Sequence, residues 1–417
     1  MSSKNPYDLV KLFGGQGVSL FGSLISRIAL PFLLIYCLRA TSLEVAWVRI
    51  AQIVPGMVVG LAAGVLVDHM KRRYLLMVTD LVRAVLVALI PVVIVTHRLT
   101  LGVVIGISAC LSMAEVLFDS AFDAYLPTMV PTERLIKANA TFAAVGSVAE
   151  VGGFGLAGVI FEWLHAAATF SIDAVSFVVS SVSLWMIRKP ESYSRDTTGT
   201  PGLSWRDIGD GFRTLRTHTI LGRMALLDGF NNVFFGLSGV VYILYISREL
   251  HIPPILQGLL YSAGGVVSLA TSRISDQLFH KIGINRALIA GALAAASGTA
   301  LLVVATGPLW LMALFVFGQQ LLGDGGDTVL GIGTAAVRQA HTENALLGRV
   351  RSSWLVLSAV GLLIGTVVGG QIGIVMGLRN ALLIGVMVRL IVAAIAWRSA
   401  PIVTSTKSIG NDIEASS

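Results

Sequence analysis

Long apolar runs separated by short polar stretches dominate the chain. Most runs hold about 20 or more residues, the length at which a helix crosses the hydrocarbon core of a bilayer. The pattern therefore predicts an all-α integral membrane protein with twelve transmembrane helices. The expected spans are residues 12–38, 45–67, 74–96, 101–128, 138–163, 167–188, 220–247, 256–279, 285–306, 309–337, 346–375 and 378–398.

The longest polar stretch divides the first six spans from the last six. Its first part is rich in Ser, Thr, Gly and Pro, which is typical of a flexible linker. After Ser204, apolar residues recur on one face of a short predicted helix, which favours a place on the membrane surface. We expect an N-terminal six-helix half over 1–188, a cytoplasmic linker over 189–219, a C-terminal half over 220–399 and a cytoplasmic tail over 400–417.

The two halves resemble each other in sequence. When the chain is shifted by 210 residues, Glu133 overlays Glu343 and Gly155 overlays Gly365. Parallel repeats of this size are typical of transporters, in which the substrate path lies between the repeats.

The composition excludes a soluble fold, and the distribution of basic residues indicates on which side of the membrane the loops and termini lie. Hydrophobic residues make up 55% of the sequence and charged residues only 13%, far from the averages of soluble domains. Loops after even-numbered spans carry fifteen Lys and Arg residues, and loops after odd-numbered spans carry four. Basic loops lie in the cytoplasm, so we expect both termini there. The net charge of +7 is then a property of these loops and does not indicate nucleic-acid binding.

The loop between the second and third spans carries a recognisable motif, "GVLVDHMKRR". Gly64, Asp68, Arg72 and Arg73 match the loop signature of the major facilitator superfamily, which the chain resembles at this point. The resemblance implies an inner gate in which Asp68 caps a helix or pairs with a cation and Arg72 reaches a carboxylate. The alternative is a simple positive-inside signal, to which Arg72 and Arg73 would contribute anyway.

Four further segments resemble one branch of that superfamily, the macrolide-efflux and enterobactin-exporter type: "DLVRA", "PTERLIKANA", "SIDAVSFVVSSVSL" and "LGRVRSS". Two positions depart from the branch, because Phe154 follows Gly153 and Ser23 stands where an acid is common. The resemblance implies a monomeric secondary active exporter of small amphipathic compounds in the bacterial cytoplasmic (inner) membrane, with proton antiport and without a cofactor. An importer or a lipid or nutrient carrier of the same fold is the alternative.

Three carboxylates follow one another along the fourth span. Glu115, Asp119 and Asp123 fan over about 80° of one helix face. A central charge facing lipid would cost about 2.5–3.5 kcal/mol, so this face should look inward. Asp123, near the inner end, is placed for Arg72 or Arg73.

Glu115 lies deeper and is the better proton carrier or binder of a cationic substrate, and Asp119 fits either role. Static salt bridges from these acids to Arg27, Arg49 or Arg83 are the alternative interpretation.

Polar residues in other spans extend this hypothesis. Arg27 in the first span fits a cavity position or an ion pair with Glu115, and Asp80 and Arg83 fit an internal pair. In the seventh span, Asp228, Asn231 and Asn232 share a face. Asp324 in the tenth span lies one turn from Asp327, which suits a coupling site or a flexible outer gate.

No catalytic triad, nucleotide-binding loop or metal-ligand spacing is evident, and the seven histidines lie in loops or at helix ends. We therefore expect neither an enzyme nor a metal site.

Overall fold

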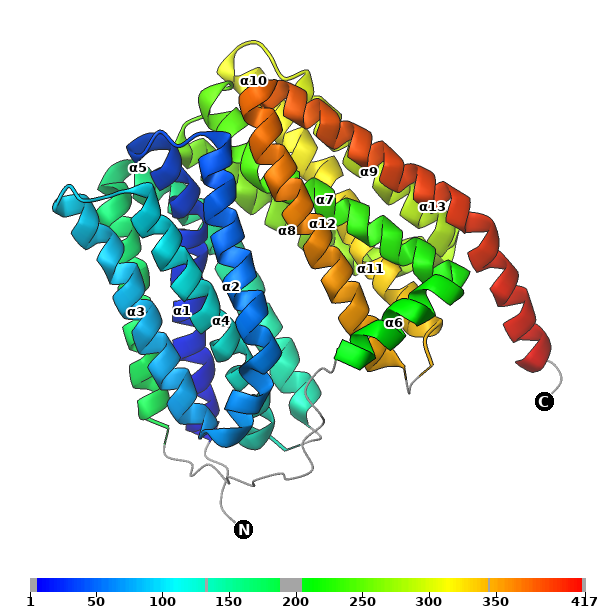
Figure 1. The fold of residues 1–417 in the computed structure, drawn as a ribbon, viewed down its shortest axis with the longest axis horizontal. Coiled ribbons are helices and arrows are strands. Elements are labelled where there is room, and N and C mark those ends of the chain that lie inside the picture. The colour runs from blue at the N-terminus through cyan, green and yellow to red at the C-terminus, as the bar shows by residue number, and fades with distance from the viewer. Residues whose placement is uncertain (1–5, 132–133, 188–204, 344–345, 415–417) are drawn as a thin grey trace. The chain divides into compact units, whose positions relative to one another are not determined.

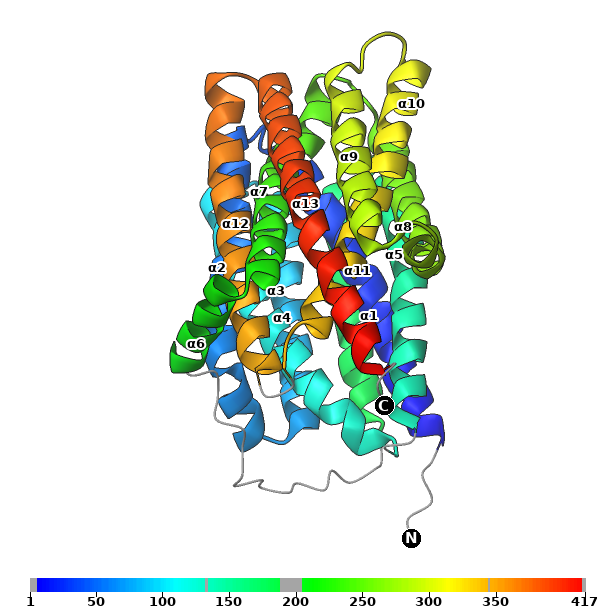
Figure 2. The ribbon, with the colours of Figure 1, turned by 90° about the vertical axis from the view of Figure 1, so that its right-hand side faces the viewer.

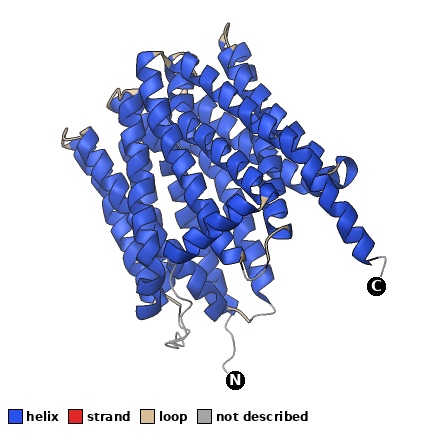
Figure 3. Ribbon diagram, turned by 45° about the vertical axis from the view of Figure 1, so that its right-hand side comes forward, coloured by secondary structure: helices blue, strands red, loops and turns tan. Residues whose placement is uncertain are grey.

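The computed structural model describes residues 6–131, 134–187, 205–343 and 346–414, and every regular element in this part of the chain is a helix. Figure 3 shows this all-helical architecture. The expected flexible part of the linker lies outside the described residues. The short helix expected after Ser204 is α6 (Trp205–Thr217).

The N-terminal part of the chain contains α1 (Pro6–Phe32) with a π-helical turn η1 (Leu33–Cys37), α2 (Ser42–His69), α3 (Arg72–Val95), α4 (Leu101–Met129) and α5 (Leu135–Trp185) (Figure 1). The 51 residues of α5 cover two predicted spans. His165 has φ 62° and ψ 174°, a non-helical conformation that interrupts α5 between these two spans. The two predicted helices are therefore both present, and the label α5 covers the pair because they meet at this kink.

The C-terminal part contains α7 (Thr219–Arg248), α8 (Pro254–Ile282), α9 (Ile284–Val303), α10 (Leu309–Gln319), η3 (Gln320–Asp324), α11 (Gly325–Ala340), α12 (Leu347–Val375) and α13 (Leu378–Glu414). The tenth predicted span corresponds to α10, the π-helical turn η3 and α11 in succession. Helix α13 continues beyond the span predicted to end at residue 398.

Ten helices in the described residues are long and apolar enough to cross a membrane. Helix α5 counts once among them although it covers two predicted spans, and the α10–η3–α11 run is not included. The chain is an all-α, multi-pass membrane protein, as the sequence predicts.

The helices group into two compact units. The first comprises α1, α3, α4, α5, most of α2 and the N-terminal turns of α8, and within it α5 packs along both α1 and α3. The second comprises α6, α7, the rest of α8, and α9 to α13, together with the first turn of α2. Within the second unit α13 packs along α9 and α7, as Figure 2 shows.

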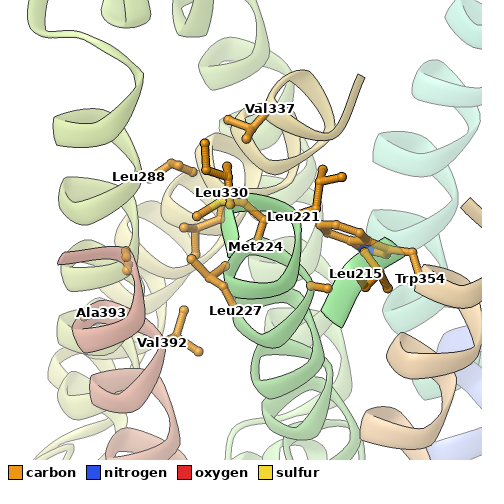
Figure 4. Packing of buried hydrophobic residues seen from close by; sticks show 14 of the residues in the cluster. Leu215, Leu221, Met224, Leu227, Leu288, Leu330, Val337, Trp354, Val392 and Ala393 are labelled. Carbon is orange, nitrogen blue, oxygen red and sulfur yellow. The ribbon is translucent and has the colours of Figure 1, made fainter. Parts of the chain in front are cut away.

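Helix α7 is the centre of the hydrophobic core of the second unit. Leu221, Met224 and Leu227 of α7 are almost fully buried. Figure 4 shows them among side chains from the surrounding helices, namely Leu288, Leu330, Val337, Trp354, Val392 and Ala393. Leu215 of α6 joins the same cluster, so α6 is packed onto this unit.

Glycines bring α7 and α12 into backbone contact. A Cβ atom added to Gly236 would overlap the carbonyl oxygen of Leu362 and lie 2.6 Å from the amide nitrogen of Thr366. A Cβ on Gly365 would likewise overlap the carbonyl oxygen of Val233. Small residues are what allow membrane helices to approach so closely. We call this contact the α7–α12 glycine seam.

We expect Gly236→Ala to destabilise the protein by about 1–3 kcal/mol, because the added methyl group meets backbone atoms that have no room to move. Gly331→Ala in α11 is the matched control, since a Cβ there meets nothing within 4 Å. The measurement is thermal unfolding of the two purified variants in detergent. Equal midpoints for both variants would contradict the tight packing of the seam.

Candidate functional site

The three α4 acids project from one helix with exposed side chains. Asp119 lies within electrostatic range of Glu115, Asp123 and two arginines, Arg27 and Arg83. Among the residues that the structure describes, none of the three carboxylates has a cation within ion-pair distance. In this conformation the static salt bridges considered above are not formed.

Arg83 is committed to a different acid. It forms a buried ion pair with Asp80, one turn away on α3, which confirms the internal pair expected from their spacing. Ser180 of α5 donates a hydrogen bond to Asp80 (2.6 Å), and Gln16 of α1 donates to Ser180 (2.8 Å). The guanidinium also lies 4.0 Å from the centre of the Phe118 ring. One buried arginine thus joins α1, α3, α4 and α5 through a continuous polar network.

The basic residues of the loop motif bind main-chain oxygens. Arg72 donates to the carbonyl of Ala124 on α4 (3.1 Å). Arg73 donates to the carbonyls of Leu184 (2.8 Å) and Trp185 (2.5 Å) at the end of α5. Arg72 therefore contacts α4 at the residue next to Asp123, and its predicted pairing with the Asp123 carboxylate stays a prediction.

The structure gives little information on the other two residues of the motif, Gly64 and Asp68. Gly64 is exposed on α2, and a Cβ there would meet nothing within 4 Å. The side chain of Asp68 lies outside the described part of the structure. The inner-gate role of this motif stays a prediction.

Arg27 is exposed on α1, and the structure has no ion pair between it and Glu115 within the described residues. Its neighbours by sequence spacing, Gln16 and Ser19, are buried. On α1, Gln16 therefore belongs to the Arg83 network, whereas Arg27 remains exposed.

Asp228 is the centre of a second polar cluster, in the second unit. Its carboxylate accepts hydrogen bonds from Trp354 Nε1 (2.9 Å), Asn232 Nδ2 (3.1 Å) and the Ser358 hydroxyl. The donors come from α7 and α12, so the carboxylate bridges the same two helices as the glycine seam. The Arg338 guanidinium lies 5.0 Å from the Trp354 ring centre and is the charged group nearest this cluster on α11.

Asn231 belongs to another site, which the sequence analysis missed. Arg389 of α13 is only 2% exposed and forms a bidentate ion pair with Asp327 of α11. Its Nη1 also donates to Asn231 Oδ1 (2.7 Å), and the Phe234 ring centre lies 3.7 Å from the guanidinium. The available signal was a lone arginine inside an apolar membrane span, which is rare unless it is paired or functional.

Asp324 ends the π-helical turn η3 and is half-buried. Helix α8 leaves room for it at Gly264, where an added Cβ would overlap the carboxylate and lie 2.7 Å from Gln320 Nε2. Asp324 thus faces α8 while Asp327 faces α13, although one turn separates them.

Among the described residues no three His, Cys, Asp or Glu side chains gather as they would around a metal ion.

Comparison with known proteins identifies the family. A sequence model of the Major Facilitator Superfamily matches residues 12–337, and the chain therefore belongs to this superfamily of membrane transporters. The chain is also similar to Macrolide efflux protein A of Streptococcus pyogenes, with 25% identity over 216 residues, 52% of each chain. The Multidrug efflux pump Tap of Mycolicibacterium fortuitum is 26% identical over 213 residues, 50% of this chain and 52% of Tap. The chain thus spans about half the length of these relatives.

Solved structures agree on the fold. The nucleoside transporter NupG superposes with a TM-score of 0.78 at 9% identity, covering 94% of this chain and 98% of that chain. A bacterial homologue of the iron transporter ferroportin in an inward-facing state gives a TM-score of 0.75 at 16% identity, covering 94% and 98%. At these identities the likeness establishes the architecture alone.

We expect Asp327→Asn to destabilise the second unit by about 3–5 kcal/mol, because it leaves the buried Arg389 without an anionic partner. Replacing both members, as Asp327→Leu with Arg389→Met, should recover most of the loss, since no buried charge then remains. Thermal unfolding of the purified variants tests this. A double variant as unstable as the single one would show that the ion pair is not the source of the loss.

Proposed function

We propose that this transporter is a secondary active exporter that moves small amphipathic compounds out of the cytoplasm by alternating access, in exchange for protons. The observation that carries the proposal is the row of α4 carboxylates, which are exposed and have no direct cationic partner among the described residues. Acids in a membrane helix that are not locked in ion pairs face a water-filled path, where they can bind protons or cations.

The acids have different proposed roles because they lie at different depths. Glu115 is about 22 Å along α4 from its outer end and acts as the coupling carboxylate, with Asp119 one turn further inward. Asp123 lies next to Ala124, whose carbonyl accepts from Arg72, so a small shift of α4 would bring Arg72 to the Asp123 carboxylate and close an inner gate.

In the second unit, the described hydrogen-bond donors to Asp228 are all neutral, so it is the second candidate for a carboxylate that exchanges protons. Asn232 orients that carboxylate, and Asn231 orients Arg389. Asp324, on the π-helical turn, would move with any change in the bend between α10 and α11.

The direction of transport is inferred from the relatives. Two of them are named as efflux proteins, and they support export of drug-like compounds. NupG is a nucleoside transporter of the same fold, so architecture alone fits an importer as well. We further propose that both termini lie in the cytoplasm, on the strength of the basic loops after even-numbered spans. The bacterial relatives support a place in the bacterial cytoplasmic membrane, and we propose a monomer there by resemblance to the superfamily.

Efflux of a fluorescent amphipathic cation from energised bacteria tests the proposal. We expect the wild-type protein to lower the cellular dye in a manner that an uncoupler abolishes, and Glu115→Gln to retain dye at the level of cells without the transporter. Asp276→Asn is the matched control, because it removes one carboxylate from an exposed site at the end of α8. Its efflux should equal that of the wild type at equal membrane expression.

Two results would contradict the proposal in different ways. If Glu115→Gln exports as well as Asp276→Asn, the coupling carboxylate is not Glu115. If right-side-out vesicles accumulate the dye only when they contain the transporter, the protein is an importer.

A further inference from the structure

Helix α6 has an exposed surface that takes no part in the transport mechanism proposed above. Phe212 is 38% exposed, and the adjacent Arg213 and Arg216 are exposed as well. On a helix these three residues cover about 100° of arc, with Arg216 between the other two. An apolar ring therefore lies directly beside two cationic groups. We call this patch the α6 surface.

Packing holds α6 at the ends of membrane-crossing helices. It ends at Thr217, and the spanning helix α7 begins two residues later at Thr219. Its Gly211 lies so close to the first turns of α12 that an added Cβ would overlap the carbonyl oxygen of Arg349. Leu215 is buried in the same cluster as Trp354 (Figure 4). The α6 surface is thus fixed beside the first turns of α7 and α12, both of which are long and apolar enough to cross a membrane.

Within the described part of the chain, no acidic side chain pairs with the two arginines of the α6 surface. Asp210 on α6 pairs with Arg349 of α12 (3.3 Å), which turns this acid away from the arginines of its own helix. Among the described residues, neither Arg213 nor Arg216 has a carboxylate within ion-pair distance. Two exposed guanidinium groups without an ion-pair partner among the described residues favour the binding of an anion from outside the protein.

We propose that the α6 surface binds the headgroup of an anionic phospholipid in the adjoining leaflet. Arg213 and Arg216 donate hydrogen bonds to the phosphate, for which the planar guanidinium is well suited. Phe212 inserts its ring at the boundary between headgroups and acyl chains, as apolar residues of interfacial helices do. A soluble phosphate compound would use the arginines but leave Phe212 in water.

Lipid binding here ties α6 to the bilayer, and α6 is packed on α12 and continuous with α7. The surface therefore anchors the second unit at one leaflet through contacts that involve none of the α4 acids. Each arginine near an anionic membrane surface contributes a roughly fivefold gain in affinity.

The test is a lipid titration of the full-length purified protein in detergent, followed by native mass spectrometry. The two probes are phosphatidylglycerol and phosphatidylcholine with the same acyl chains. We expect the wild type to prefer phosphatidylglycerol, and Arg213→Gln with Arg216→Gln to weaken its binding by about 25-fold. Phe212→Ser should weaken both lipids alike.

The matched control is Lys281→Gln with Arg286→Gln, which removes the same charge from exposed positions on α8 and α9. It should keep the preference of the wild type. Arg213→Lys with Arg216→Lys, which keeps both charges, should keep most of it, and thermal unfolding identifies any variant that fails to fold.

Two outcomes would overturn the proposal. If the control pair weakens phosphatidylglycerol as much as the α6 pair, the attraction comes from overall charge and not from this surface. If glycerol 3-phosphate displaces the lipid from the wild type at comparable concentration, the surface is a site for soluble anions.

Discussion

The cost of placing a charge in hydrocarbon organises this structure. Arg83 and Arg389 lie inside membrane-crossing helices, and each is almost fully buried against an aspartate and a phenylalanine ring. Such a pair is stable only while both charges are present, so each arginine fixes the helices that supply its partners. The α4 acids differ from these two arginines, because they are exposed and have no ion-pair partner among the described residues.

Each of the two units contains one such buried arginine–aspartate pair, but different helices supply its members. In the first unit the arginine and its aspartate share helix α3, and Ser180 extends the network to α5. In the second unit the arginine lies on α13 and its aspartate on α11, with Asn231 of α7 as a further acceptor. Fixed charges therefore brace the packed interior of each unit, and the α4 carboxylates lie outside these two networks.

The sequence predicted what local spacing determines. The length of the apolar runs predicted the membrane-spanning helices, and the three-residue spacing of Asp80 and Arg83 predicted the ion pair between them. It could not predict the partner of Arg389, because Asp327 is 62 residues away and only packing brings the two together. Helical periodicity placed Asn231 and Asn232 on one face, whereas neighbouring helices divide them between two clusters. It also predicted that Arg72 reaches α4, but not that a main-chain oxygen is the acceptor.

The glycine seam has a mechanical consequence. Where backbone meets backbone at Gly236 and Gly365, no flexible side chain lies between α7 and α12 to absorb a displacement. Asp228 clamps the same two helices through the Trp354 indole and the Ser358 hydroxyl. Helices α7 and α12 are therefore expected to move together as one rigid pair, so that a rotation of one helix also rotates the other. Any bending within this unit would then have to occur at other elements, and η3 interrupts the regular α-helical hydrogen bonding between α10 and α11.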